Sequence, residues 1–184
     1  MMVESIFSVP NEISFAEAIA LTQSLLNRVE QHEISEAVFQ PTLSDLVQTE
    51  NGARGFFVTY LSDPRPLVEQ LRTVVIEALK TSADVVSPLL VKNLVMSTAM
   101  AMTHRRNQDE TMAQGSDQVR SRTLQLIQAL PLPQLKEQAH HLATSIRTGS
   151  GEYQLFLERW SYDLAQKQAM LSALEQAGLL ETSG

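Results

Sequence analysis

The chain has 184 residues, 43% of them hydrophobic, and a formal net charge of −7 at pH 7. The apolar content is too high and the charge too small for a disordered chain. The absence of cysteine excludes disulfide scaffolds, thiolate metal sites and cysteine nucleophiles, and the acidic balance disfavours general binding of polyanions.

The N-terminal part is predicted to be helical after an extension over residues 1–13. Ser14 and Glu17 have the spacing of a capping box, and apolar residues follow at helical intervals, which predicts a helix over about residues 14–31. In the next segment, Pro41 is expected to break or kink a helix because it lacks a backbone donor. Asn51 and Gly52 are typical of a turn.

Residues 55–61 (GFFVTYL) suit either a buried strand or a short buried helix. Their aromatic and β-branched side chains are common in strands. No second strand is recognisable, however, and an isolated strand would leave its backbone groups unpaired. We favour a helix, and an α+β fold with residues 55–61 as a strand is the alternative.

The middle of the chain is its most apolar part. An apolar stripe over residues 67–79 predicts an amphipathic helix. Ser87 and Pro88 then have the residue types of an N-cap and a first helical position. The helix that follows, to about His104, is apolar on nearly every face and is predicted to be the buried centre of a bundle. Its polar residues make it a poor membrane span, so no membrane insertion is predicted.

Further helices are predicted after residue 116 and after residue 135, followed by a turn at Gly149–Gly151. Residues 150–178 are expected to form one long C-terminal helix that could project from the body or contact a partner. The predicted fold is therefore all-α, a bundle of about six to eight helices. Residues 1–184 are expected to form a single helical domain.

Polar residues on the central helix are candidates for ligand binding. A buried polar group costs free energy unless it is paired, so such residues need partners within the protein or in a ligand. Pairing within the protein, or a place on an exposed flank, is the alternative for all of them. The candidates are Lys92, Asn93, Ser97 and His104.

An arginine cluster follows the central helix and is a candidate anion site, since guanidinium groups grip carboxylates and phosphates. Asp109, Glu110 and Asp117 could instead neutralise the cluster locally. No aromatic stacking platform accompanies the arginines, so no nucleic-acid partner is predicted. The cluster consists of Arg105, Arg106, Arg120 and Arg122.

Tyr153, Phe156 and Trp160 form a stripe at helical spacing that is either core or a surface for a partner. Glu137 and His140 share a helix face, as in di-iron bundles. Those bundles need a second such pair, which this sequence lacks, so no metal is predicted.

No P-loop, GxGxxG, HExxH or GxSxG motif occurs, so catalytic residues cannot be named. The sequence favours a non-enzymatic protein-interaction or assembly module that binds a protein partner or forms a homodimer, without a cofactor. A small-molecule or anion-binding helical bundle is the alternative, and an enzyme of unrecognised class is the second. The N-terminal residues lack the features of a secretory signal, which, together with the absence of cysteine, predicts a cytoplasmic location.

Three segments, GFFVTYL at residues 55–61, VKNLVMSTAM at residues 91–100 and HRRN at residues 104–107, resemble a family of small uncharacterised proteins of cyanobacteria. The resemblance implies a cytoplasmic protein of a photosynthetic cell. It implies no reaction, so no functional residue is assigned from it.

Overall fold

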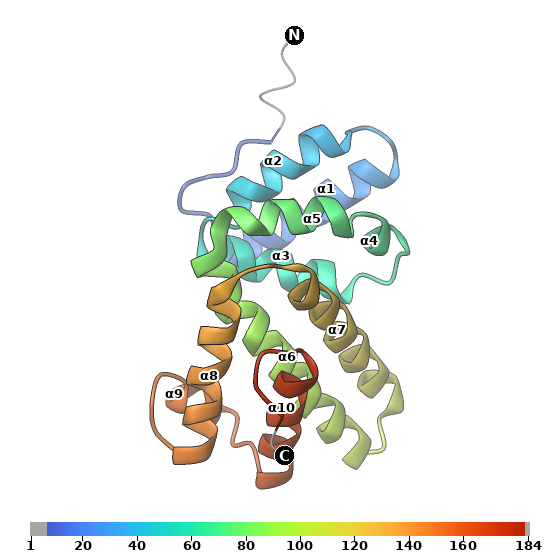
Figure 1. The fold of residues 1–184 in the computed structure, drawn as a ribbon. Helices are drawn as coiled ribbons and strands as arrows, with labels where there is room; N and C mark the ends of the chain where they lie inside the picture. Colours follow the sequence, from blue (N-terminus) through green and yellow to red (C-terminus); the bar gives the residue numbers. More distant parts are fainter. Residues whose placement is uncertain (1–6, 183–184) are drawn as a thin grey trace. The chain divides into compact units, whose positions relative to one another are not determined.

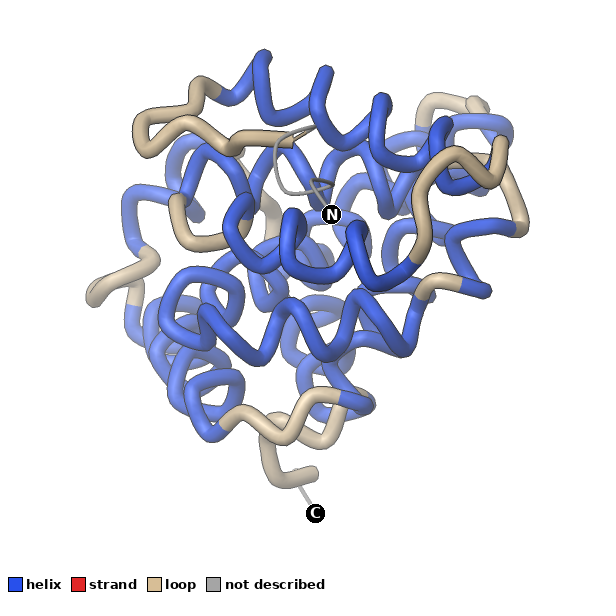
Figure 2. Tube along the Cα trace, turned by 90° about the horizontal axis from the view of Figure 1, so that it is seen from above, coloured by secondary structure: helices blue, strands red, loops and turns tan. Residues whose placement is uncertain are grey.

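The computed structural model describes residues 7–182, and every regular element in that range is a helix (Figure 1). Figure 2 likewise shows helices joined by loops, with no strand in the described part. The all-α prediction is confirmed. Residues 55–61 lie inside a helix, so the α+β alternative is wrong. The helices are α1 (Phe15–Glu30), α2 (Glu36–Leu46), α3 (Glu50–Ser62), α4 (Leu67–Gln70), α5 (Arg72–Leu79), the 3₁₀ turn η1 (Lys80–Ser82), α6 (Ala83–Arg106), α7 (Glu110–Ala129), α8 (Pro133–Thr148), α9 (Gln154–Arg159) and α10 (Leu164–Gln176).

The chain divides into two compact units, residues 1–89 and residues 90–184, with the boundary inside α6. Each unit is described by itself below. The single domain expected over residues 1–184 stays a prediction. Of the expected N-terminal extension, residues 1–6 lie outside the described residues, and residues 7–13 form no helix.

The first unit is built on the packing of α1 against α3 and of α2 against α5. Helix α1 begins as predicted, because the Ser14 hydroxyl accepts a hydrogen bond from the Glu17 backbone N–H and the Glu17 carboxylate accepts one from the Ser14 backbone N–H. Buried aromatic side chains of α3 form part of the core of this unit; they are Phe56, Phe57 and Tyr60.

A helix break at Pro41 and a turn at Asn51 and Gly52, both considered for the first unit, do not occur. Pro41 lies inside α2, and the carbonyl that it leaves without a partner belongs to exposed Ala37, where water can donate to it. Asn51 and Gly52 form the first turn of α3. Thr49 caps this helix by accepting a hydrogen bond from the Gly52 backbone N–H, and an added Cβ on Gly52 would lie 1.9 Å from the Leu46 carbonyl oxygen. Gly52 therefore serves a close approach of the backbone rather than a turn.

The start predicted for the central helix is also wrong. Helix α6 begins at Ala83, directly after η1, and contains Ser87 and Pro88 in its interior. The carbonyl that would accept from residue 88 belongs to Asp84, whose side chain is exposed. The helix tolerates the loss of this one backbone hydrogen bond, because it lies near solvent and the other residues of the helix keep their own backbone hydrogen bonds.

The middle of α6 is buried, as predicted for a central helix. Leu90, Val91, Leu94, Val95 and Ala99 are each at most 1% exposed. The continuous helical stretch Arg72–Arg106 is long and apolar enough to cross a membrane, and 61% of its most apolar window is buried inside the protein. A core helix of a soluble protein has the same properties. The absence of membrane insertion stays a prediction.

The single long helix predicted over residues 150–178 is wrong, because the chain turns between α9 and α10. Asp163 caps α10 by accepting from the Gln166 backbone N–H, while the Gln166 side chain accepts from the Asp163 backbone N–H. Ser161 has a φ of 49°, a left-handed conformation that no α-helix continues. The described residues therefore form more helices than the six to eight predicted. Short helices such as α4 and α9 leave no periodic pattern in the sequence.

Candidate interaction site at the α9–α10 corner

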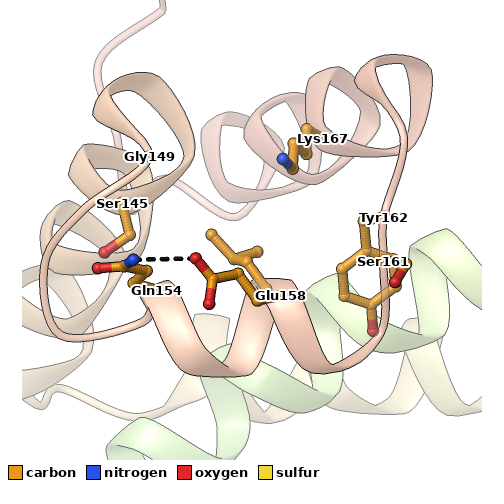
Figure 3. A pocket seen from close by; sticks show the side chains of 8 residues that line it. Ser145, Gly149, Gln154, Glu158, Ser161, Tyr162 and Lys167 are labelled. Carbon is orange, nitrogen blue, oxygen red and sulfur yellow. Dashed lines mark hydrogen bonds between the residues drawn. The ribbon is translucent and has the colours of Figure 1, made fainter.

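The second unit contains a pocket of about 320 Å³ between the end of α8, helix α9 and the start of α10 (Figure 3). We call residues 154–167, which comprise α9, the turn after it and the first turn of α10, the α9–α10 corner. The pocket is lined by Ser145, Gly149, Gln154, Leu157, Glu158, Ser161, Tyr162 and Lys167.

Tyr153 fixes the start of α9 against α8. Its side chain is buried, and its hydroxyl donates a hydrogen bond of 2.6 Å to Oε1 of Gln138. Its backbone N–H donates to the Ser145 hydroxyl at 3.1 Å. Both bonds join segments on either side of the Gly149–Gly151 turn, so α9 is attached to a helix that precedes it in the chain.

Lys92 of α6 contacts the two aromatic side chains at the start of α9. Its ammonium nitrogen lies 5.7 Å from the ring centroids of both Tyr153 and Phe156. Phe156 in turn lies 6.2 Å from Tyr162, measured between ring centroids. These cation–π and ring contacts hold α9 on α6. They also join one residue of the predicted ligand set to two residues of the predicted aromatic stripe.

Helix α10 is anchored to α6 by polar contacts. Nε2 of buried Gln166 donates to the Ala99 carbonyl at 3.1 Å and to the Thr103 hydroxyl at 2.9 Å. Arg106 at the end of α6 forms a salt bridge with Asp163. Its guanidinium, chiefly by hydrogen bonding, holds the pKa of the Asp163 carboxyl below its usual range. The turn between α9 and α10 is thus attached to α6 from both sides.

Large apolar side chains are exposed on this anchored corner. Leu155 is 80% exposed, Leu164 is 73% exposed and Trp160 is 47% exposed. They are three of the six exposed large apolar side chains among the described residues, and they fall within ten consecutive positions. The Arg159 guanidinium lies 5.7 Å from the Trp160 ring centroid. Half of the exposed large apolar side chains among the described residues therefore belong to this corner, which makes it the candidate contact surface.

Opposite charges face the pocket from its two sides. Lys167 extends from α10, and Glu158 lies across the pocket on α9 (Figure 3). Glu158 accepts a hydrogen bond of 2.9 Å from Nε2 of Gln154. No carboxylate of the described residues lies within salt-bridge distance of Lys167 or Arg159. The pocket therefore has one cation whose charge is not paired within the described protein.

The residues of the predicted ligand set lie on α6, and the structure describes their surroundings. Ser97 is satisfied by its own helix, because its hydroxyl donates to the Asn93 carbonyl at 2.6 Å. Asn93 and His104 are half-buried on α6. None of these residues, nor Lys92, lines either of the two pockets described in the second unit. Ligand binding by this set stays a prediction.

The predicted arginine cluster is largely neutralised by carboxylates. Arg105 pairs with Asp117 at 2.6 Å and with Glu110 at 3.2 Å, and Arg120 pairs with Asp117 at 3.3 Å. The hydrogen bond from Arg105 is the main cause of a lowered pKa of Asp117. Of the other two arginines in the cluster, Arg106 pairs with Asp163 as described above, and Arg122 is buried. Anion binding by the four arginines stays a prediction.

The predicted aromatic stripe divides between core and surface. Tyr153 is buried, Phe156 is half-buried and Trp160 is exposed. Leu155, Leu164 and Lys167 are not among the site residues predicted from the sequence. No local pattern marks these three residues, because their exposure depends on the turn between α9 and α10.

The two histidines of α8 lie at hydrogen-bond distance from oxygen atoms of the protein itself. His140 Nδ1 lies 2.7 Å from the Lys136 carbonyl of its own helix, and His141 Nδ1 lies 2.8 Å from Oε2 of Glu152. Within residues 7–182, no group of three or more His, Cys, Asp or Glu side chains is placed to hold a metal ion.

One protein-family model matches residues 14–177. The chain belongs to that family, which is described as Uncharacterised conserved protein UCP020893. No curated protein and no solved structure matches the chain. The family description assigns no activity.

Two tyrosines beneath the corner are expected to respond differently to phenylalanine. The Tyr153 hydroxyl has a hydrogen-bond partner, whereas the buried Tyr162 hydroxyl has none among the described residues. We expect Tyr153→Phe to lower the free energy of unfolding by about 1 kcal/mol, and Tyr162→Phe to leave it unchanged or raise it slightly. Urea denaturation at pH 7 measures both, and equal losses would contradict this assignment.

The raised pKa values of the same two tyrosines lead us to expect a loss of stability at high pH. Burial raises the pKa of Tyr162 to about 12, and burial together with the charge of Glu152 raises the pKa of Tyr153 to about 12. Below pH 10 the tyrosine hydroxyls keep their protons in both the folded and the unfolded chain. Between pH 10 and 12 the unfolded chain loses these protons first. Stability should therefore fall as pH rises through this window, and the Tyr153→Phe/Tyr162→Phe double variant should show a smaller fall.

Proposed function

We propose that this protein is a non-enzymatic protein-interaction module and that its partner covers the α9–α10 corner. The observation that carries the proposal is the exposure of Leu155, Trp160 and Leu164 on a corner that is anchored to α6 and α8. Tryptophan often supplies much of the binding energy in protein interfaces, and burying the leucines beside it removes further apolar surface from water.

The anchoring favours binding for a second reason. A surface that is already ordered loses little conformational freedom when a partner docks, so more of the contact energy appears as affinity. The Tyr153 and Gln166 hydrogen bonds and the Arg106–Asp163 salt bridge hold the corner before any partner is present.

A small-molecule binder is the second candidate. The pocket of about 320 Å³ is at the lower end of the usual size for ligand sites, and Lys167 and Glu158 could bind a charged ligand in it. This candidate leaves Leu155 and Leu164 exposed without a role, which is why the interaction module is preferred. The cytoplasmic location and the cyanobacterial origin implied by the sequence resemblance belong to the proposal as well.

The proposal is tested with a photo-crosslinking amino acid placed at position 155 or position 164 of the full chain. The control carries it at position 137, where exposed Glu137 lies on α8 of the same unit. After irradiation in cells of the source organism, we expect one protein, identified by mass spectrometry, to be captured at positions 155 and 164 and not at 137. Equal capture at all three positions, or no capture, would contradict the proposal.

A purified partner, or a second copy of the chain, then allows an affinity measurement. Leu164→Asp is expected to weaken the complex by about 30-fold, as for the loss of a binding hot spot. Leu164 is exposed at the start of α10, so this variant should keep the circular dichroism spectrum and unfolding midpoint of the native chain. A folded variant that binds with unchanged affinity would show that the corner is not the interface.

A further inference from the structure

We infer that the partner presents an acidic segment that also carries a bulky apolar side chain, an inference that rests on the proposed function above. The apolar side chain would contact Trp160 and Leu164, and the carboxylates would pair with Arg159 and Lys167. Two observations support this occupant: the charge balance of the corner and the position of its cations next to exposed apolar groups.

The charges of the corner that lack an ion-pair partner are mainly positive, although the whole chain is acidic. The chain has a net charge of −7, and the four charged residues of the corner, which balance in number, are Glu158, Arg159, Asp163 and Lys167. Asp163 is already paired with Arg106. Two cations and one carboxylate therefore remain without an oppositely charged partner among the described residues. An approaching acidic segment is repelled by most of this chain and finds local attraction here.

The two cations lie beside the exposed apolar groups. The Arg159 guanidinium lies over the exposed Trp160 ring, and a carboxylate that pairs with Arg159 would bring its own chain against the indole. Lys167 lies one turn after exposed Leu164 on α10 and reaches the pocket. A segment with acidic and apolar residues close together can thus contact both Arg159 with Trp160 and Lys167 with Leu164.

Other occupants explain fewer of these observations. A small carboxylate could pair with Lys167 in the pocket and would leave Leu155, Trp160 and Leu164 in water. A basic segment would find only Glu158, whose carboxylate already accepts a hydrogen bond from Gln154. The acidic and apolar segment is the partner that uses both the cations and the apolar side chains.

The inference is tested by selecting peptides from a random 12-residue phage library on the full chain. In parallel, selection is carried out on an Arg159→Glu/Lys167→Glu variant and on an Arg147→Glu/Lys136→Glu control, which makes the same charge change at exposed positions outside the corner. We expect the native chain and the control to select net-negative peptides that contain Leu, Phe, Trp or Met.

Affinities of the selected peptides are then measured by fluorescence anisotropy. The charge reversal in the corner should weaken binding at least tenfold, the control should change it less than threefold, and binding by the native chain should weaken between 50 and 300 mM salt. Selection of peptides without acidic residues, or unchanged affinity after reversal in the corner, would overturn the inference. So would a homodimer that is lost in Leu164→Asp and binds no acidic peptide.

A third variant separates this inference from the proposed function. Leu155→Gln/Leu164→Gln removes apolar surface and leaves every charge in place. If it loses peptide binding while the charge reversal does not, the corner is the interface and only the acidic nature of the partner is wrong. If neither variant loses binding, the corner is not the interface and both proposals fail. Circular dichroism of each variant confirms that a loss of binding is not a loss of folding.

Discussion

Replacing Phe56 with alanine is expected to lower the free energy of unfolding by about 3–5 kcal/mol, because it leaves a cavity that the core cannot refill. Phe56 is 1% exposed on α3. Its ring centroid lies 5.0 Å from that of Tyr60 in a stacked arrangement and 5.4 Å from that of Phe57. Removing the ring therefore loses buried apolar area and two aromatic contacts at once.

Val58→Ala on the same helix is the matched control. Val58 is 49% exposed, so its truncation opens no cavity and should change the free energy of unfolding by less than about 0.5 kcal/mol. Both variants are compared by urea denaturation. A loss below about 1 kcal/mol for Phe56→Ala would mean that α3 does not form the packed core described here.

Replacing Gly55 with alanine is expected to lower the free energy of unfolding by about 1–3 kcal/mol, although alanine is the better helix former by about 1 kcal/mol. A Cβ on Gly55 would lie 2.4 Å from Cβ of Ala18, 2.9 Å from the Ile19 backbone nitrogen and 3.0 Å from the Ala18 carbonyl carbon. Two of these atoms belong to the backbone of α1 and cannot rotate away. The two helices would have to separate.

Gly115→Ala provides a control with the opposite sign. Gly115 lies inside α7, and a Cβ at this position would meet no atom within 4 Å. Without a clash, only the helix preference remains, so this variant should gain about 0.5–1 kcal/mol. Ala18→Gly, combined with Gly55→Ala, should recover part of the loss by removing the closest contact. Two glycine variants that shift stability in the same direction would contradict the close approach of α1 and α3.

Local sequence patterns predicted the helical class and the start of α1. Ser14 and Glu17 are three residues apart, so the capping box forms wherever the rest of the chain lies. The apolar character of α6 similarly predicted its burial, because exposing so many apolar side chains to water would be unfavourable. These features depend on neighbours in the sequence or on composition alone.

Local patterns were misleading where one signal has two structural uses. Proline suits the first turn of a helix, yet Pro41 and Pro88 both lie further inside one. Asn51 and Gly52 are typical of a turn, yet they begin α3, where Gly52 lets the backbone approach the Leu46 carbonyl. The choice between the two uses depends on which other segment lies nearby.

The α9–α10 corner required the tertiary structure, since contacts between segments far apart in the sequence create it. Gln166 donates to the Ala99 carbonyl, Arg106 pairs with Asp163, and the Lys92 ammonium makes cation–π contacts with Tyr153 and Phe156. Asp163 and Gln166 alone could have indicated a helix start, because their capping box is local. The exposure of Leu155 and Leu164 could not be predicted, because periodicity places apolar residues on one face of a helix and only the packed chain decides whether that face is covered.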